Sequence, residues 1–141
     1  MDIYNTKRQA WALAIIRIML GAIFIAHGAQ KVLGIWGGPG LAGFVAWIGK
    51  YGVPPFLAYL AAFAEFIGGF LLLFGILPEL GALCVIPVML GAVFIVHWQQ
   101  GFFGQHGGYE YPLSLAITTA ALILGVPDVL TFISLKDILK R

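Results

Sequence analysis

Residues 17–31 read RIMLGAIFIAHGAQK, and this stretch decides the fold. It lies within an apolar segment, Trp11–Leu33, that is long enough to cross a bilayer as an α-helix, for which about 20 residues are needed. The stretch nevertheless carries Arg17, His27, Gln30 and Lys31. Polar and charged side chains inside a membrane span are costly, and they usually face a partner or a water-filled cavity. We therefore expect these four side chains to face the protein interior rather than lipid.

The composition is that of an integral membrane protein. Hydrophobic residues make up 61% and charged residues 10% of the 141 residues, against about 45–50% and about 25% in soluble domains. The net charge of +2 and the scattered basic residues argue against nucleic-acid binding. The single cysteine, Cys84, excludes an internal disulfide and a cysteine metal set, and it is expected to pack as a small core residue.

The hydropathy pattern predicts one all-α domain over residues 1–141, an integral membrane four-helix bundle. Its predicted spans are Trp11–Leu33, Phe56–Leu77, Leu80–Trp98 and Tyr111–Phe132. The connection between the first two spans, residues 34–55, contains an apolar stretch at helical spacing from Leu41 to Ile48. That stretch is too short to span, so it predicts an interfacial or re-entrant helix.

Basic residues predict the orientation. Most of them flank the two ends of the chain, at positions 7, 8, 136, 140 and 141. Because an excess of Lys and Arg marks the cytoplasmic side, both termini are expected in the cytoplasm. Small residues such as Gly68, Gly69 and Gly81 let membrane helices approach closely, which predicts tight packing within the bundle, with a homo-oligomer seam as the alternative.

Arg17 and Glu65 are predicted to form a buried ion pair. At 1.5 Å of rise per residue, Arg17 lies roughly 9 Å and Glu65 roughly 18 Å from the cytoplasmic edge. An extended arginine side chain covers most of that gap, and pairing removes two otherwise prohibitive charges. The pair is compatible with a structural role in fixing helix register and with a place on a substrate, quinone or proton path.

A second group of polar residues is predicted near the outer face. His27, Gln30 and Lys31 lie near the outer end of the first span, His97 near that of the third, and Glu110 in the following loop. These five residues are the candidate ligand-binding set, and a quinone headgroup is the favoured ligand. Two histidines at one depth are also compatible with haem ligation, although hydrogen bonding to loop carbonyls is the commoner role. No metal site and no catalytic residue are assigned.

The order and spacing of these motifs resemble the DoxX family of small bacterial four-helix membrane proteins. The resemblance rests on Arg17, Gly21, Phe24, His27-Gly28 and Lys31, on Glu65 to Gly69 with Leu72 and Gly75, on Met89 to His97, and on Gly107 to Pro112. It implies a four-helix bundle in the bacterial inner membrane and an association with redox chemistry. Relatives include the membrane subunit of a thiosulfate:quinone oxidoreductase.

Three functional interpretations stay open on the sequence. The first is a quinone-interacting subunit of an oxidoreductase system, working with a soluble or membrane redox partner. The second is a non-enzymatic scaffold or assembly factor for peripheral redox enzymes. The third is a carrier of small solutes or lipids.

Overall fold

The computed structural model describes residues 3–125 and 128–140, and within them the side chains from residue 6 onward. This part of the chain is helical, without a β-sheet. Its six α-helices are α1 (Ile3–Leu33), α2 (Gly40–Gly49), α3 (Pro55–Phe74), α4 (Pro78–Gly91), α5 (Glu110–Gly125) and α6 (Leu135–Ile138). A π-helical stretch, η1 (Ala92–His97), and two 3-10 turns, η2 (Trp98–Gln100) and η3 (Gly104–His106), continue from α4 toward α5.

Three helical stretches are long and apolar enough to cross a bilayer: Thr6–Leu33, Pro55–Phe74 and Pro78–Gln100. They correspond to the first three predicted spans. The fourth predicted span, 111–132, is only partly helical, because α5 has 16 residues and ends at Gly125. At 1.5 Å per residue α5 is about 24 Å long, shorter than the roughly 30 Å hydrocarbon core.

The expectation of a simple four-helix bundle is therefore corrected. Predicted span 111–132 crosses residues 126 and 127, which lie outside the described residues, and it continues into a turn instead of a helix. There the Asp128 side chain accepts hydrogen bonds from the Leu130 amide (2.9 Å) and the Thr131 hydroxyl (3.2 Å), which hold the chain in a turn. Ser134 then caps α6.

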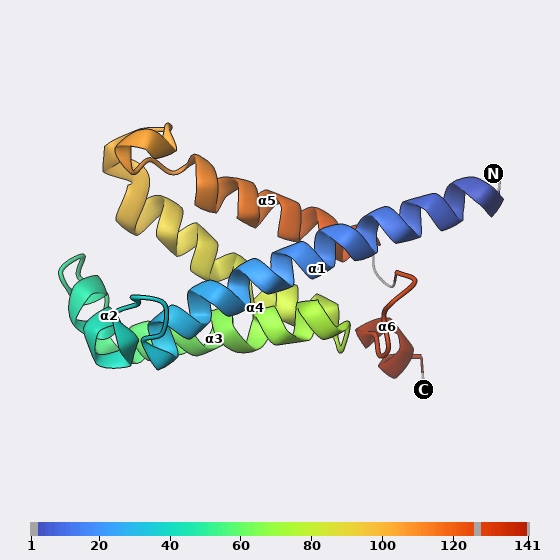
Figure 1. Ribbon diagram of the computed structural model, residues 1–141, viewed down its shortest axis with the longest axis horizontal. Coiled ribbons are helices and arrows are strands. Elements are labelled where there is room, and N and C mark those ends of the chain that lie inside the picture. The colour runs from blue at the N-terminus through green and yellow to red at the C-terminus, as the bar shows by residue number, and fades with distance from the viewer. Residues whose placement is uncertain (1–2, 126–127, 141) are drawn as a thin grey trace.

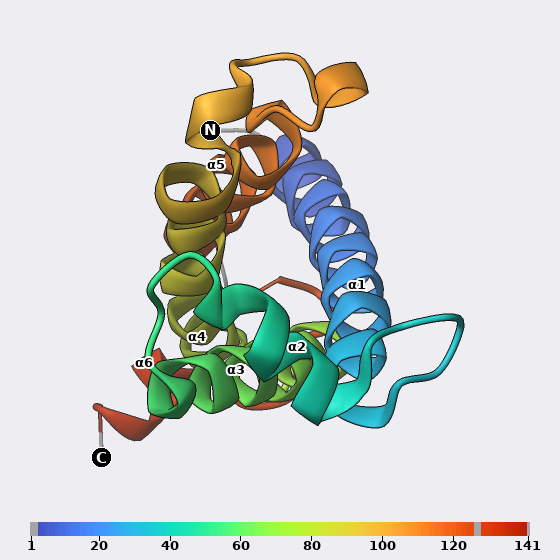
Figure 2. The same cartoon turned by 90° about the vertical axis from the view of Figure 1, so that its left-hand side faces the viewer.

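Four helices pack in a ring, in which α1 contacts α3, α3 contacts α4, α4 contacts α5, and α5 contacts α1. Figure 2, which looks along the molecule, shows α1 and α4 on opposite sides with α2 lying across one end. Glycines allow the closest approaches. A Cβ on Gly28 would lie 2.5 Å from the Phe66 Cα atom, and one on Gly68 would lie 2.9 Å from the Gly81 carbonyl oxygen. The predicted tight packing within the chain is thus confirmed.

The predicted short helix in the first outer connection is present as α2. It packs against α3, and its Phe44 and Ile48 side chains are buried with Ala58, Ala62 and Val96 in a core cluster of their own. Figure 1 shows α2 and the loop before α5 at one end of the molecule. The start of α1, the α3–α4 connection and α6 lie at the other end.

Candidate functional site: an apolar cavity with a polar rim

Arg17 is buried as predicted, but its partner is Asp128 and not Glu65. The Arg17 Nε atom donates to Asp128 Oδ2 at 2.7 Å, and Nη2 donates to Oδ1 at 3.3 Å. The guanidinium also donates to the carbonyls of Leu72, Leu73 (3.2 Å) and Leu130 (3.1 Å). Two of these carbonyls, those of Leu72 and Leu73, belong to the last turn of α3, where a helix has fewer N–H partners for its carbonyls, so Arg17 adds a donor at this helix end.

The register between α1 and α3 explains the correction. Gly28 faces Phe66, so Glu65 lies nearly level with Gly28. From Arg17 to Gly28 the helix rises about 16 Å, too far for an arginine at position 17 to reach Glu65. The depth estimate from the sequence assumed that α1 and α3 start and end at one common membrane edge. In the structure the N-terminal part of α1 extends well past the C-terminal end of α3 (Figure 1).

A second buried carboxylate closes the same end of the molecule. Glu79, in the first turn of α4, accepts hydrogen bonds from the Ser134 hydroxyl and from the Leu135 amide (3.3 Å). The Phe132 amide donates to the Gly75 carbonyl at 2.9 Å. The segment after α5 is thereby fastened across the α3–α4 connection. We call this network, Arg17 and Asp128 with Glu79 and Ser134, the end clamp.

Asp128 is ionised in the clamp. Burial on its own raises the pKa of the carboxyl group, but hydrogen bonds from Arg17, the Leu130 amide and Thr131, with the guanidinium charge, outweigh it and lower the pKa below the usual 3.8. Because the side chains of Arg17 and Asp128 are 1% and 0% exposed, water screens this pair little. The end clamp therefore has a structural role, because it holds the segment after α5 against α1 and the α3–α4 connection.

Glu65 pairs with Lys31, the last polar residue of the opening stretch. The two side chains form a salt bridge in which the carboxylate is 2% exposed and the ammonium 22%. The Lys31 Nζ atom also lies 5.2 Å from the centre of the Phe44 ring, within cation–π range. The sequence analysis named Lys31 as a candidate ligand-binding residue and gave Glu65 to Arg17, whereas in the structure Lys31 and Glu65 pair with each other.

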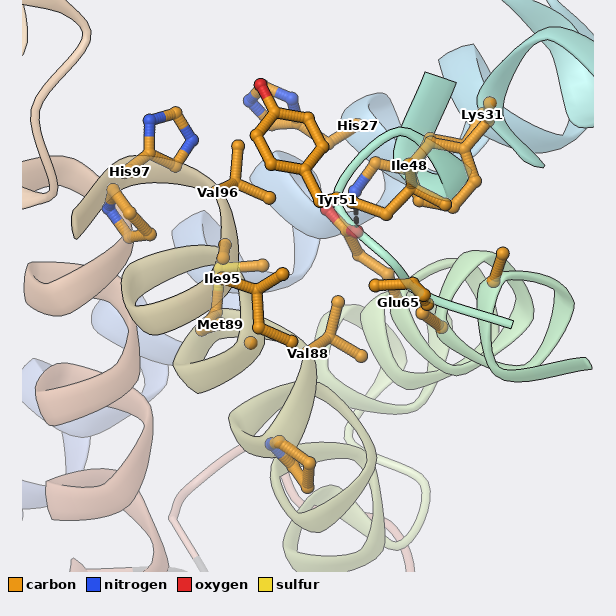
Figure 3. Close-up of a pocket in the computed structure, with 18 of the residues that line it drawn as sticks. His27, Lys31, Ile48, Tyr51, Glu65, Val88, Met89, Ile95, Val96 and His97 are labelled. Carbon is orange, nitrogen blue, oxygen red and sulfur yellow. Dashed lines mark hydrogen bonds and ion pairs between the residues drawn. The ribbon is translucent and has the colours of Figure 1, made fainter. Parts of the chain in front are cut away.

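This salt bridge lies on the wall of a cavity of about 950 Å³ that is lined by residues of α1, α2, α3, α4, η1 and the start of α5. Most of the lining is apolar, with contributions such as Ile48, Ala61, Val88 and Met89. The ionisable side chains that line it are His27, Lys31, Tyr51, Glu65, Cys84, His97 and Tyr111. Figure 3 shows His27 and His97 on one side of the cavity and the Lys31–Glu65 bridge on another. The site is therefore an apolar pocket with a few convergent polar groups, which is typical of small-molecule binding.

Both predicted histidines line the cavity. The Nδ1 atom of His97 lies 2.6 Å from the Gly107 carbonyl oxygen, and His27 Nε2 lies 3.5 Å from the Tyr111 hydroxyl. His97 reaches the cavity from the end of η1, and π-helical stretches frequently occur at functional sites because they reorient side chains. The structure thus brings His27, Lys31 and His97 to one cavity, from helices far apart in the chain.

The other two predicted ligand-binding residues do not line this cavity. Gln30 lines an adjoining hollow of about 330 Å³ and donates from its amide to the Trp36 carbonyl at 3.3 Å. Glu110 accepts a hydrogen bond from the Gly104 amide at 2.6 Å, which shapes the loop before α5. No group of three or more His, Cys, Asp or Glu side chains that could hold a metal ion is found where the chain is described.

A family model described as DoxX matches residues 12–98. The chain belongs to the DoxX family. One curated relative, from Bacillus subtilis (strain 168), is named "Putative oxidoreductase CatD"; it is 31% identical over 110 residues, which cover 78% of this chain and 75% of the relative. No solved structure matches the chain. The DoxX match includes α1 from residue 12 onward, α2 to α4 and His97, and it leaves out Tyr111 and Asp128.

The sequence analysis did not identify several residues of the end clamp and of the cavity lining in this DoxX chain. Asp128 was counted as part of an apolar span, although an acid next to a proline near the end of a predicted helix is a signal for a turn. Tyr111 was treated only as the start of the fourth span, and Trp47 and Tyr51 were not among the predicted ligand-binding residues, whereas all three line the cavity. Only the tertiary fold shows that α2 lies over the cavity.

Proposed function

We propose that this DoxX protein is a membrane-embedded member of an oxidoreductase system and that its cavity holds the ring of a quinone. The observation that carries the proposal is the cavity itself, about 950 Å³ of mostly apolar lining with a salt bridge and two histidines among its walls. Its volume falls within the range of sites for drug-sized ligands. A quinone combines an apolar ring and tail with two polar oxygens, and this combination matches the lining.

The membrane supplies such a ligand directly. The stretches Pro55–Phe74 and Pro78–Gln100 are long and apolar enough to cross a bilayer, which supports a lipid environment for α3 and α4. The cavity is lined in part by outward-exposed apolar side chains, including Leu57, Leu60 and Ile95. A lipophilic ring therefore reaches the cavity from the lipid without crossing water. We place the end clamp on the cytoplasmic side of the inner membrane and the cavity nearer the outer side, because the start of α1 and α6 lie at the clamp end (Figure 1) and carry basic residues, Lys7 and Arg8 in α1 and Lys136 in α6.

The chain supplies binding rather than electrons. Its single cysteine, Cys84, excludes a dithiol relay within the chain. The Bacillus relative is named a putative oxidoreductase, which supports a redox role for this chain. In that role electrons pass between the bound ring and a separate redox partner. His27, His97 and the Lys31–Glu65 bridge orient the ring and exchange hydrogen bonds with its oxygens.

The test is to purify the protein in a mild detergent and measure the quinones that co-purify, by solvent extraction and mass spectrometry. Ala61, which lines the cavity, is replaced by Trp to fill it, and Ala22, exposed on α1 away from the cavity, is replaced by Trp as the control. We expect quinone near one molecule per chain in the wild type and in Ala22→Trp, and its loss in Ala61→Trp.

An equal and trace quinone content in all three proteins, with no binding of added quinone, would overturn the proposal. The scaffold interpretation would then be favoured, because it requires no occupant in the cavity.

A further inference from the structure

The C-terminal segment, residues 129–140, exposes large apolar side chains although the fold holds its backbone in place. Phe132 is 78% exposed and Leu139 is 81% exposed. Four more apolar side chains of the segment are exposed: Val129, Leu130, Ile133 and Ile138. In water this exposure is unfavourable, and a contiguous apolar surface of this kind marks a contact with another protein or with a membrane.

Hydrogen bonds fix the segment against the ends of α3 and α4. The Phe132 amide donates to the Gly75 carbonyl at 2.9 Å, and the Leu77 amide donates to the Ile133 carbonyl at 2.7 Å. The end clamp adds its ion pair and its second buried carboxylate on either side of these bonds. Irregular backbone close to hydrocarbon needs its polar groups satisfied within the protein, and these bonds meet part of that requirement.

The depth of the segment follows from α1. Trp11 on α1 is 53% exposed, and tryptophan is enriched where membrane helices meet the lipid headgroups. Arg17, which donates to the Leu130 carbonyl of the segment, lies about 9 Å further along the helix. The headgroup region on each side of a bilayer is about 5–8 Å thick. The segment therefore lies near the boundary between headgroups and hydrocarbon.

The short helix α5 supports the same depth. It is about 24 Å long, about 6 Å less than the hydrocarbon core, so the chain leaves α5 before it has crossed the bilayer. Leu124, in the last turn of α5, is 86% exposed. Ile76, which pairs with Ile133 in a β-bridge, is 42% exposed, and the neighbouring Phe74 is 52% exposed. The exposed apolar surface of the segment thus continues onto the end of α3, a helix of span length.

Basic side chains accompany this apolar surface. Lys136 in α6 and Lys140 after it are exposed, and Lys7 and Arg8 of α1 lie at the same end of the molecule (Figure 1). The acidic side chains that the structure describes at this end all accept hydrogen bonds within the protein: Glu79, Asp128 and Asp137. Exposed apolar residues together with lysines are typical of interfacial segments that attract anionic lipids.

We propose that residues 129–140 form an interfacial anchor that binds anionic phospholipids at the clamp end. Phe132 and Leu139 reach toward the acyl chains, and Lys136 and Lys140 bind the headgroup phosphates. Lipid is the occupant that fits both the positive charge and the continuity with α3. The proposal goes beyond the proposed function, since it requires that the long helices cross a bilayer and does not depend on a ligand in the cavity.

A fluorescent label at Leu139 tests the depth of the anchor. Because Cys84 is the single cysteine, a Cys84→Ala background accepts one label, either at Leu139→Cys or, as the control in water, at Thr6→Cys, about 8 Å beyond Trp11 along α1. The full chain is placed in phosphatidylcholine nanodiscs, and quenching by nitroxide-labelled lipid is compared with quenching by iodide in the buffer. We expect the lipid to quench the label at position 139 and iodide to quench the label at position 6.

The other occupants give different results. Strong iodide quenching of both labels would place the segment in water, open to a soluble protein, and would overturn the proposal. Protection of the label at position 139 from both quenchers would show that protein covers it, such as a second copy of the chain, and would overturn the proposal as well.

The preference for negative charge is measured with the same label. Nitroxide-labelled phosphatidylglycerol is compared with nitroxide-labelled phosphatidylcholine, and we expect half-maximal quenching at an about fivefold or lower mole fraction of the anionic lipid. Lys136→Gln combined with Lys140→Gln should remove this preference. Lys50→Gln, which removes an exposed charge next to α2 at the other end, is the matched control and should keep it. Equal quenching by both lipids, or a preference that survives the double variant, would overturn the assignment to anionic lipid.

Discussion

Replacing Arg17 by Met tests the end clamp, because the variant keeps an unbranched side chain of similar length and removes the guanidinium. Its loss leaves the Asp128 carboxylate buried without a counter-charge, and it leaves the Leu73 and Leu130 carbonyls without their donor. Breaking a buried ion pair in this way costs about 3–5 kcal/mol. Asp128 keeps two local hydrogen bonds, so we expect the lower part of that range, about 3 kcal/mol in the free energy of unfolding.

The assay is a double-mutant cycle on the free energy of unfolding in detergent, with unfolding monitored by circular dichroism. Arg17→Met is combined with Asp128→Asn in one cycle and with Glu65→Gln in the other. We expect a coupling energy of about 1–3 kcal/mol between Arg17 and Asp128, and near-additivity, within about 0.5 kcal/mol, between Arg17 and Glu65. Coupling of Arg17 to Glu65, with none to Asp128, would refute the assignment of partners and restore the pair that the sequence suggested.

Two further predictions concern helix packing and pH. Gly28→Ala places a methyl group against the Phe66 backbone and should destabilise the fold by about 1–3 kcal/mol. The control is Gly91→Ala, where the nearest atom to the added methyl group is 4.0 Å away, and it should be neutral or slightly stabilising. Thermal unfolding in detergent measures both variants, and equal effects would contradict the α1–α3 contact. Since the pKa of Asp128 is lowered by folding, its stabilisation is complete above about pH 5 and is lost as the pH falls below 3.8 through the folded-state value. Arg17→Met should reverse that trend, because protonation then relieves an unpaired buried carboxylate, and an unchanged acid profile in the variant would count against the pair.

Much of the fold follows from hydropathy and helix-terminating residues. The first three spans were predicted within a few residues at most ends, since long apolar stretches leave little choice but helices in lipid. The short helix α2 was found from its spacing of apolar residues, Leu41 to Ile48. The fourth span failed because apolar content continues to Phe132, although Asp128 and Thr131 turn the chain and end the helical region early.

The sequence predicted which polar residues are buried better than it predicted which of them pair with each other. The sequence marks Arg17, Lys31 and Glu65 as buried polar residues because lipid tolerates them poorly. It does not contain the helix register, which depends on how closely Gly28 approaches Phe66. Side chains on a helix lean toward its N-terminus, so Lys31 leans back along α1 to Glu65, while Arg17 lies beyond the end of α3.

Photoaffinity labelling with an azido-quinone tests most directly the claim that the cavity under α2 holds a quinone-type ring. The purified protein is irradiated with the probe, with and without excess unlabelled quinone, and the modified residues are located by mass spectrometry. We predict competitor-sensitive labelling within residues 44–61 and 84–97, which line the cavity. Labelling confined to the end clamp, around Arg17 and residues 128–138, or labelling that is not diminished by excess unlabelled quinone, would contradict the claim.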